Sequence, residues 1–116
     1  MNTKHFDIEK RFLEDNIYIL TITCHEEESC LYIPINFENK IFNSTLLTKH
    51  LKINLELLNK WINDNMIECK NISSNNELIS GSWCSINNLC SLISFLGYDL
   101  YYSVVETYLD LLDESD

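Results

Sequence analysis

Hydrophobic and polar residues alternate with a period of two in the first third of the chain. In residues 5–13, Phe6, Ile8 and Phe12 fall on one side and charged residues fall on the other. This alternation is typical of a strand with one buried face. Residues 17–24 are rich in β-branched and aromatic residues and predict a second strand.

The third alternating segment, residues 31–37, contains the one proline of the chain, Pro34. Proline has no backbone N–H, so we expect this strand to lie at a sheet edge or to be bulged at Pro34. The connections between the three strands are short, which favours an antiparallel meander.

The pattern then becomes helical. Asn43 and Ser44 can cap a helix whose leucines recur at helical spacing, and Asn54 can cap a second helix. Residues 66–70 and 77–80 predict two short extended pieces that form a hairpin around a polar tip.

The last third of the chain predicts two further helices. Ser85 can cap a helix that runs to Leu96, with Gly97 as the residue that ends it. Residues 98–112 predict a final helix with two faces. Its apolar stripe consists of Tyr101, Val104, Val105, Tyr108 and Leu112. Its polar stripe consists of Asp99, Ser103, Glu106, Asp110 and Asp113.

Together these segments predict an α+β fold in a single domain, residues 1–116. A three-stranded antiparallel meander makes residues 1–42 strand-rich, and residues 43–116 are mostly helical with a short hairpin. A chain of 116 residues can bury a core without disulfides or a metal. No run approaches the roughly 18 apolar residues of a membrane span, so we expect no membrane association.

The net charge of −10 is unevenly distributed. Every Lys and Arg lies at or before Lys70, whereas acids continue to the C-terminus. A negative surface repels the phosphates of nucleic acid and attracts basic proteins. It also keeps a protein soluble without any further role. We therefore expect a basic protein partner and disfavour nucleic acid.

The acidic stripe of the last predicted helix is the first candidate docking surface. Acids three and four residues apart repel one another, by roughly 0.2–0.5 kcal/mol per pair, so apolar packing has to hold this helix. A tyrosine beside carboxylates can anchor a basic surface, although a plain solvated face is the alternative. The candidate residues are Asp99, Tyr102, Glu106, Asp110 and Asp113. A second candidate is the loop tip formed by Glu26, Glu27 and Glu28.

Five cysteines and an N-terminus without an apolar leader predict a cytoplasmic protein with reduced thiols. Cys24 and Cys30 share their spacing with Cys84 and Cys90, but paired zinc ligands usually stand two to four residues apart. We expect buried thiols rather than a metal site or a catalytic Cys–His pair. The chain also lacks a phosphate-binding loop, so the sequence predicts a non-enzymatic protein without a cofactor.

The segment TKHLKINLELLNKWINDNMI, residues 48–67, resembles a helix-turn-helix of the MerR and excisionase type. The matching positions are a leucine, a buried turn aliphatic, a second-helix aliphatic and a tryptophan, here Leu51, Ile53, Leu58 and Trp61. The resemblance extends over residues 44–112. It departs from the family at Thr48 and at Lys52, which stands where the turn usually has a glycine.

The resemblance implies a DNA-binding regulator, with Asn59, Lys60 and Asn63 facing the groove, or a chaperone-modulating protein. The charge favours a different function. It predicts a small acidic protein that docks on a basic protein and inhibits it, as an immunity protein neutralises a nuclease-type toxin.

Overall fold

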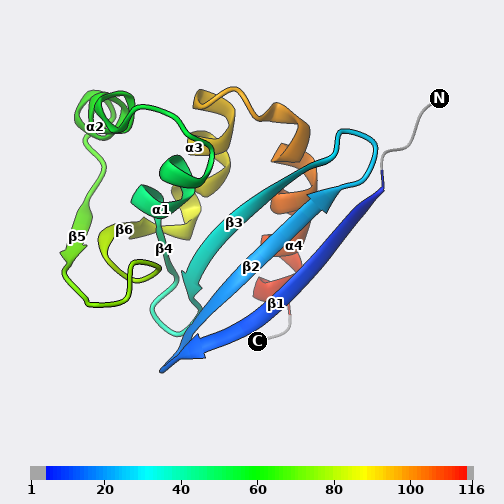
Figure 1. Ribbon diagram of the computed structural model, residues 1–116, viewed down its shortest axis with the longest axis horizontal. Helices are drawn as coiled ribbons and strands as arrows, with labels where there is room; N and C mark the ends of the chain where they lie inside the picture. Colours follow the sequence, from blue (N-terminus) through cyan, green and yellow to red (C-terminus); the bar gives the residue numbers. More distant parts are fainter. Residues whose placement is uncertain (1–4, 115–116) are drawn as a thin grey trace.

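A computed structural model describes residues 5–114, and side chains as far as residue 112. The described chain has the predicted α+β fold, with a six-stranded antiparallel sheet in the order β1-β2-β3-β4-β6-β5 (Figure 1). The strands are β1 (Phe6–Glu14), β2 (Ile17–Cys24), β3 (Ser29–Asn36), β4 (Ile41–Asn43), β5 (Cys69–Ile72) and β6 (Gly81–Ser85). The helices are α1 (Ser44–His50), α2 (Leu55–Asp64), α3 (Leu89–Phe95) and α4 (Tyr102–Glu114), with 3₁₀ turns η1 (Ile86–Asn88) and η2 (Asp99–Tyr101). None of the described helices is long and apolar enough to cross a membrane.

The predicted meander is confirmed, but the prediction of an edge or bulge at Pro34 is wrong. β3 lies between β2 and β4 and pairs with β2 without a bulge. The Phe37 N–H donates to the Asn16 carbonyl (3.3 Å), so odd-numbered residues of β3 direct their backbone groups toward β2. The backbone of Pro34, which has no N–H to donate, therefore faces β4 and not β2. There β4 pairs only with Ile35 and Asn36, which leaves Pro34 outside the ladder.

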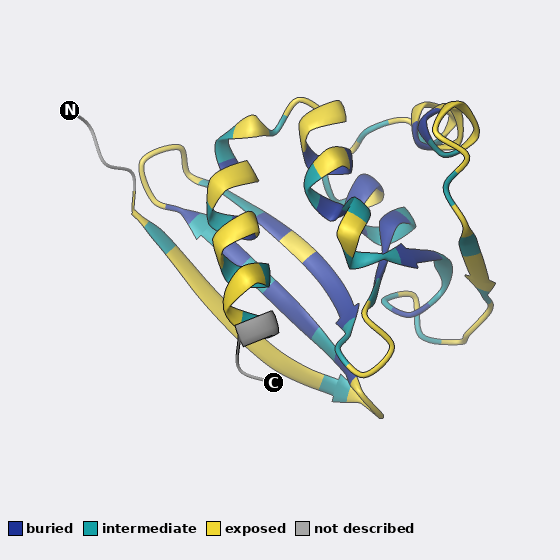
Figure 2. Cartoon of the chain, turned by 180° about the vertical axis from the view of Figure 1, so that it is seen from behind, coloured by how far each residue is buried: buried dark blue, intermediate teal, exposed yellow. Residues whose placement is uncertain are grey.

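The main core lies between the sheet and the helices, and α3 and α4 cover one face of the meander (Figure 2). Its strand residues come from alternate positions of β2 and β3, because side chains on one face of a strand recur every two residues. These fully buried residues are Leu20, Ile22, Leu31, Ile33 and Ile35, and the helices add Leu89, Leu92, Tyr101 and Val105. A smaller cluster on the opposite face joins Ile17, Ile79 and Trp83.

β1 is more exposed than its alternating sequence predicts. Ile8 and Phe12 share the face covered by the helices but remain 40% and 58% exposed. Only Phe6 at the start of the strand packs against the main core, where its ring meets that of Tyr101 at 5.7 Å. The prediction of one buried face for this strand is wrong, because β1 is the outermost strand and the core is filled from β2 and β3.

The predicted helix caps are confirmed. The side chain of Asn43 accepts a hydrogen bond from the N–H of Leu46 (3.1 Å), and that of Asn54 accepts one from Glu56 (2.9 Å). Each bond satisfies one backbone donor that the first helical turn leaves unpaired. The side chain of Ser85 likewise accepts a hydrogen bond from the N–H of Asn87 (3.2 Å) in η1.

Among the described residues, three helices end with a residue in the left-handed conformation. After α3 this residue is Gly97, as predicted, with a φ of 87°. After α1 and α2 it is Lys52 (φ 60°) and Met66 (φ 51°). At the end of α1, the N–H of Ile53 donates to the carbonyl of Thr48 (3.2 Å), and this bond closes a Schellman turn. A lysine thus occupies a conformation that a glycine adopts without steric cost.

The hairpin of β5 and β6 begins its second strand at Gly81, so the prediction of an extended piece over residues 77–80 is wrong. The amide of Asn43 donates to the carbonyls of Leu78 (3.1 Å) and Ser80 (3.0 Å) and holds the residues before β6 as a loop. A Cβ at Gly81 would lie 2.4 Å from Asn43 Oδ1, so this close approach requires glycine.

Candidate functional site: the groove between α3 and α4

The start of α4 is attached to the sheet through Tyr101. This side chain is fully buried, and its hydroxyl lies 2.6 Å from that of Ser29 at the start of β3. Val105, one turn later, is also fully buried, whereas Val104 and Tyr108 are half-buried. The predicted apolar stripe therefore faces the sheet, and the acidic side of α4 faces outward.

A groove of about 270 Å³ lies between α4 and the start of α3. Three of the predicted docking residues, Tyr102, Glu106 and Asp110, line it from successive turns of α4. Residues four apart lie above one another on a helix, so this spacing aligns them along one wall. The other lining residues are Leu109 on α4 and Ile86, Asn87, Cys90 and Ser91 on the η1–α3 side. No lysine or arginine is among the described residues that line the groove.

The negative charge of the groove affects the ionisation of the Cys90 thiol. The thiol donates to the carbonyl of Tyr102 across the helix pair (3.9 Å). Burial raises the pKa of this thiol, and the negative charges of Glu106 and Asp110 raise it further. The field that disfavours a thiolate also favours a cation, so the groove is suited to an ammonium or guanidinium group.

Asp99, at the start of the predicted acidic stripe, is not among the described residues that line the groove. Asp99 accepts a hydrogen bond from the hydroxyl of Ser94 (2.7 Å), which joins the end of α3 to η2. The side chain of Asp113 lies outside the described residues. Of the predicted docking residues with described side chains in η2 and α4, Tyr102, Glu106 and Asp110 line the groove and Asp99 does not.

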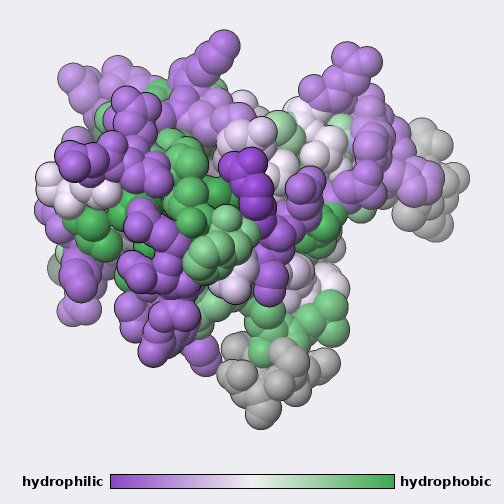
Figure 3. All heavy atoms as spheres, turned by 60° about the horizontal axis from the view of Figure 1, so that its bottom comes forward, coloured by the Kyte–Doolittle hydropathy of each residue, from purple (hydrophilic) through white to green (hydrophobic). Residues whose placement is uncertain are grey.

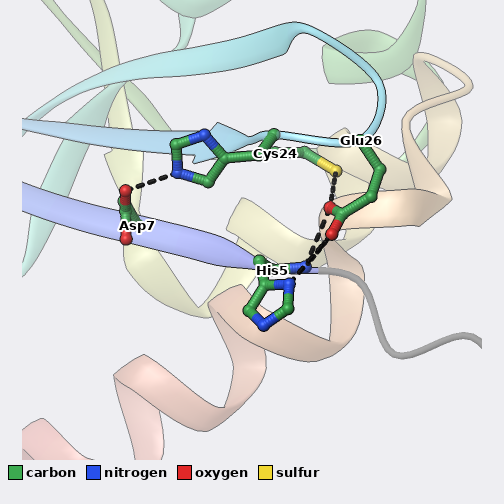
Figure 4. Close-up of polar contacts among 5 residues, drawn as sticks. His5, Asp7, Cys24 and Glu26 are labelled. Atoms are coloured by element: carbon green, nitrogen blue, oxygen red, sulfur yellow. Dashed lines mark hydrogen bonds and ion pairs between the residues drawn. The ribbon is translucent and has the colours of Figure 1, made fainter.

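The predicted loop of glutamates contains a structural contact that the sequence did not indicate (Figure 4). The carboxylate of Glu26 accepts the backbone N–H of His5 (2.8 and 3.0 Å) and lies 3.0 Å from the Nδ1 atom of the same residue. Hydrogen bonding from the His5 N–H, above all, lowers the pKa of Glu26 to about 2. Beside it, His25 Nε2 lies 2.5 Å from a carboxylate oxygen of Asp7. Glu26 thus fixes the start of β1 to the β2–β3 turn.

Glu27 and Glu28 are exposed in the same turn, and Glu28 takes a φ of 50°. None of the three glutamates lines the groove between α3 and α4. The turn adjoins the start of α4 through the contact between Ser29 and Tyr101. The two predicted docking surfaces are therefore neighbours, but they do not form one site.

All five cysteines are free thiols, and the spacing of the first pair does not bring Cys24 and Cys30 together. Cys24 lies in the main core, whereas Cys30 lies on the opposite face of the sheet. There its Sγ atom is 3.8 Å from His50 Nε2, and the ring of Tyr32 stacks on the imidazole at 4.3 Å. Local sequence patterns do not single out this pair, because it arises where α1 packs beside β3. Among the described residues, no cluster of three His, Cys, Asp or Glu could hold a metal ion.

Comparison with known proteins returned no matching family model, no matching curated protein and no matching solved structure.

Proposed function

We propose that this protein is a small acidic binding protein without enzymatic activity. It docks in the cytoplasm on a basic protein and inhibits it, in the manner of an immunity protein that neutralises a nuclease-type toxin. The observation that carries the proposal is the groove between α3 and α4. Its acidic wall, Glu106 and Asp110, stands beside Tyr102, which is 39% exposed.

The groove has the chemistry to receive a lysine or arginine of the partner. The cation would lie between the carboxylates of Glu106 and Asp110. Its aliphatic stem would pack on Tyr102 and Leu109, because long basic side chains bury their stems while the charge stays solvated. The net charge of −10 would steer such a partner toward the protein at low ionic strength. A nuclease is a fitting partner, since its substrate-binding surface is basic.

Affinity capture followed by an activity assay tests this proposal. The tagged chain should recover a basic protein from the host at low salt, and less of it at high salt. The purified pair should show reduced activity of the captured protein, for example slower nucleic-acid cleavage by a nuclease. The proposal is wrong if no basic protein is recovered, or if the captured protein keeps full activity in the complex.

A helix-turn-helix regulator of the MerR type is the second candidate function. One observation favours it: Lys52 takes the left-handed conformation in the turn between α1 and α2, at the position where the family has a glycine. The charge on the exposed face of α2 opposes it. Lys60 forms an ion pair with Asp64 (2.9 Å), and its neighbours Asn59 and Asn63 are uncharged. Duplex binding usually requires several basic residues at phosphates.

A gel-shift experiment on mixed genomic DNA at low salt separates the two functions. Docking on a basic protein predicts no retardation at micromolar protein, whereas a regulator would retard the DNA. A chaperone-modulating protein would instead recover a J-domain protein in the capture experiment.

A further inference from the structure

The outer edge of β1 has no strand partner among the described residues. β1 is nine residues long and contains no proline, and its one irregularity lies at its end, between Phe12 and Glu14. Proteins usually shorten, bulge or cover such an edge, because its unpaired backbone groups bind other strands. An edge of this length is suited to pairing with a further strand.

The register shows which residues present their backbone groups at this edge. The N–H of His25 donates to the carbonyl of His5 (3.2 Å), in line with the pairing of β1 and β2. Odd-numbered residues of β1 therefore direct their backbone groups toward β2. The even-numbered residues Ile8, Lys10 and Phe12 direct theirs outward.

The side chains along this edge are complementary to a second copy of the same strand. We propose that β1 pairs antiparallel with β1 of a second copy, so that Ile8 faces Phe12 and Glu9 faces Arg11 of that copy. Because the pair is two-fold symmetric, each of these contacts occurs twice. On the helix side it covers Ile8 and Phe12, which are 40% and 58% exposed. On the other face it joins exposed side chains of opposite charge, Glu9 and Arg11.

The positions of the backbone hydrogen bonds favour the register centred on Lys10 over the register centred on Glu9. Glu9 and Arg11 stand at positions without backbone hydrogen bonds across the new pair, where facing side chains come closest. Lys10 faces its own copy at the centre, but its ammonium is drawn over the rings of Tyr18 (4.9 Å) and Phe37 (5.2 Å). Shifting the centre to Glu9 would instead oppose two glutamates at a close position.

Sedimentation equilibrium of the full chain tests the proposal. At high micromolar concentration the mass should be twice 13.7 kDa. Glu9→Arg and Arg11→Glu should each weaken the dimer by roughly tenfold or more, because each places like charges at two symmetric contacts. The double variant should recover most of the affinity. Glu77→Arg, the same charge change in an exposed loop, is the matched control and should leave the dimer unchanged.

Three results would overturn the proposal. The chain could remain monomeric at every concentration, or dimerise equally well with either single reversal, or fail to recover in the double variant. Pairing with a strand of another protein, and not with a second copy, would give the first result.

A second variant tests the edge directly. Lys10→Pro removes a backbone N–H that points away from β2, so the monomer should keep its circular-dichroism spectrum while the dimer is lost. In the parent protein, the amides of Ile8 and Lys10 should exchange slowly with solvent at high concentration and quickly on dilution. A dimeric Lys10→Pro protein, or rapid exchange at all concentrations, would contradict the proposal.

Discussion

The hydroxyl groups of Ser29 and Tyr101 lie 2.6 Å apart, although 72 residues separate them in the chain. This contact joins the start of β3 to η2, directly before α4, at a fully buried tyrosine. It therefore sets the position of α4, and with it the groove.

Replacing Tyr101 by phenylalanine should lower the free energy of unfolding by about 1 kcal/mol, because the variant loses the hydrogen bond and keeps the buried ring. Urea denaturation at neutral pH measures the change. Tyr108→Phe, on the same stripe but only half-buried, is the control and should have a smaller effect. Equal stability of the Tyr101→Phe protein and the wild type would show that the contact does not hold α4.

Replacing Lys52 by glycine should stabilise the protein. Lys52 has a φ of 60°, which costs a residue with a Cβ roughly 1–2 kcal/mol. Glycine avoids this cost but loses more conformational entropy on folding, so we expect a net gain of about 0.5–1 kcal/mol in urea denaturation. The same substitution at Lys49, inside α1, should instead destabilise by about 1 kcal/mol. A loss of stability in Lys52→Gly would contradict the left-handed conformation of the turn.

Ionised Glu26 should contribute to the free energy of unfolding, and this contribution should be lost at acid pH. Hydrogen bonds from His5 lower its folded-state pKa from 4.5 to about 2. The ionised carboxylate therefore contributes stability above pH 4.5, and this contribution falls as the pH drops toward 2. Urea midpoints across this range should decline less in Glu26→Gln than in the wild type. Glu28→Gln, in the same turn, should follow the wild-type curve; if both variants do so, the contact with His5 has no energetic role.

The cysteines should differ in their reactivity toward alkylating agents, and the reactivity of Cys90 should depend on the negative charge of the groove. Burial raises the pKa of Cys84 to about 12, so this thiol should resist alkylation in the native protein. Burial disfavours the thiolate form of Cys90, and the negative charges of Glu106 and Asp110 disfavour it further. Converting both acids to their amides should lower the pH at which iodoacetamide modifies Cys90, as measured by mass spectrometry. Cys30, beside His50, should be unaffected; an unchanged Cys90 profile would mean that the groove lacks the inferred negative field.

The local elements of the fold could be predicted because their signals are short-range. Asn43 and Asn54 cap helices through their own first turns, and Gly97 ends α3 within one turn. The exposure of Ile8 and the burial of Pro34 depend on the order of strands in the sheet. That order is set by contacts between distant segments, which periodicity does not contain.

The same division holds for the candidate site. Tyr102, Glu106 and Asp110 could be selected from the helical spacing and the acidic charge of the last segment, and all three line one wall of the groove. Cys90 could not be assigned to the site, because its place there depends on how α3 packs against α4. The contact of Glu26 with His5 spans 21 residues and likewise leaves no trace in the local pattern.

The most direct test of the proposed docking groove is the affinity of the purified basic partner for charge-reversed protein, measured by isothermal titration calorimetry. The double variant Glu106→Lys and Asp110→Lys should bind at least about a hundredfold more weakly, since close charge pairs at interfaces contribute several kcal/mol. Glu68→Lys with Glu77→Lys makes the same change in net charge at exposed sites outside the groove. This control should lose far less affinity. Equal losses in the two double variants would mean that only net charge matters, and would contradict docking at the groove.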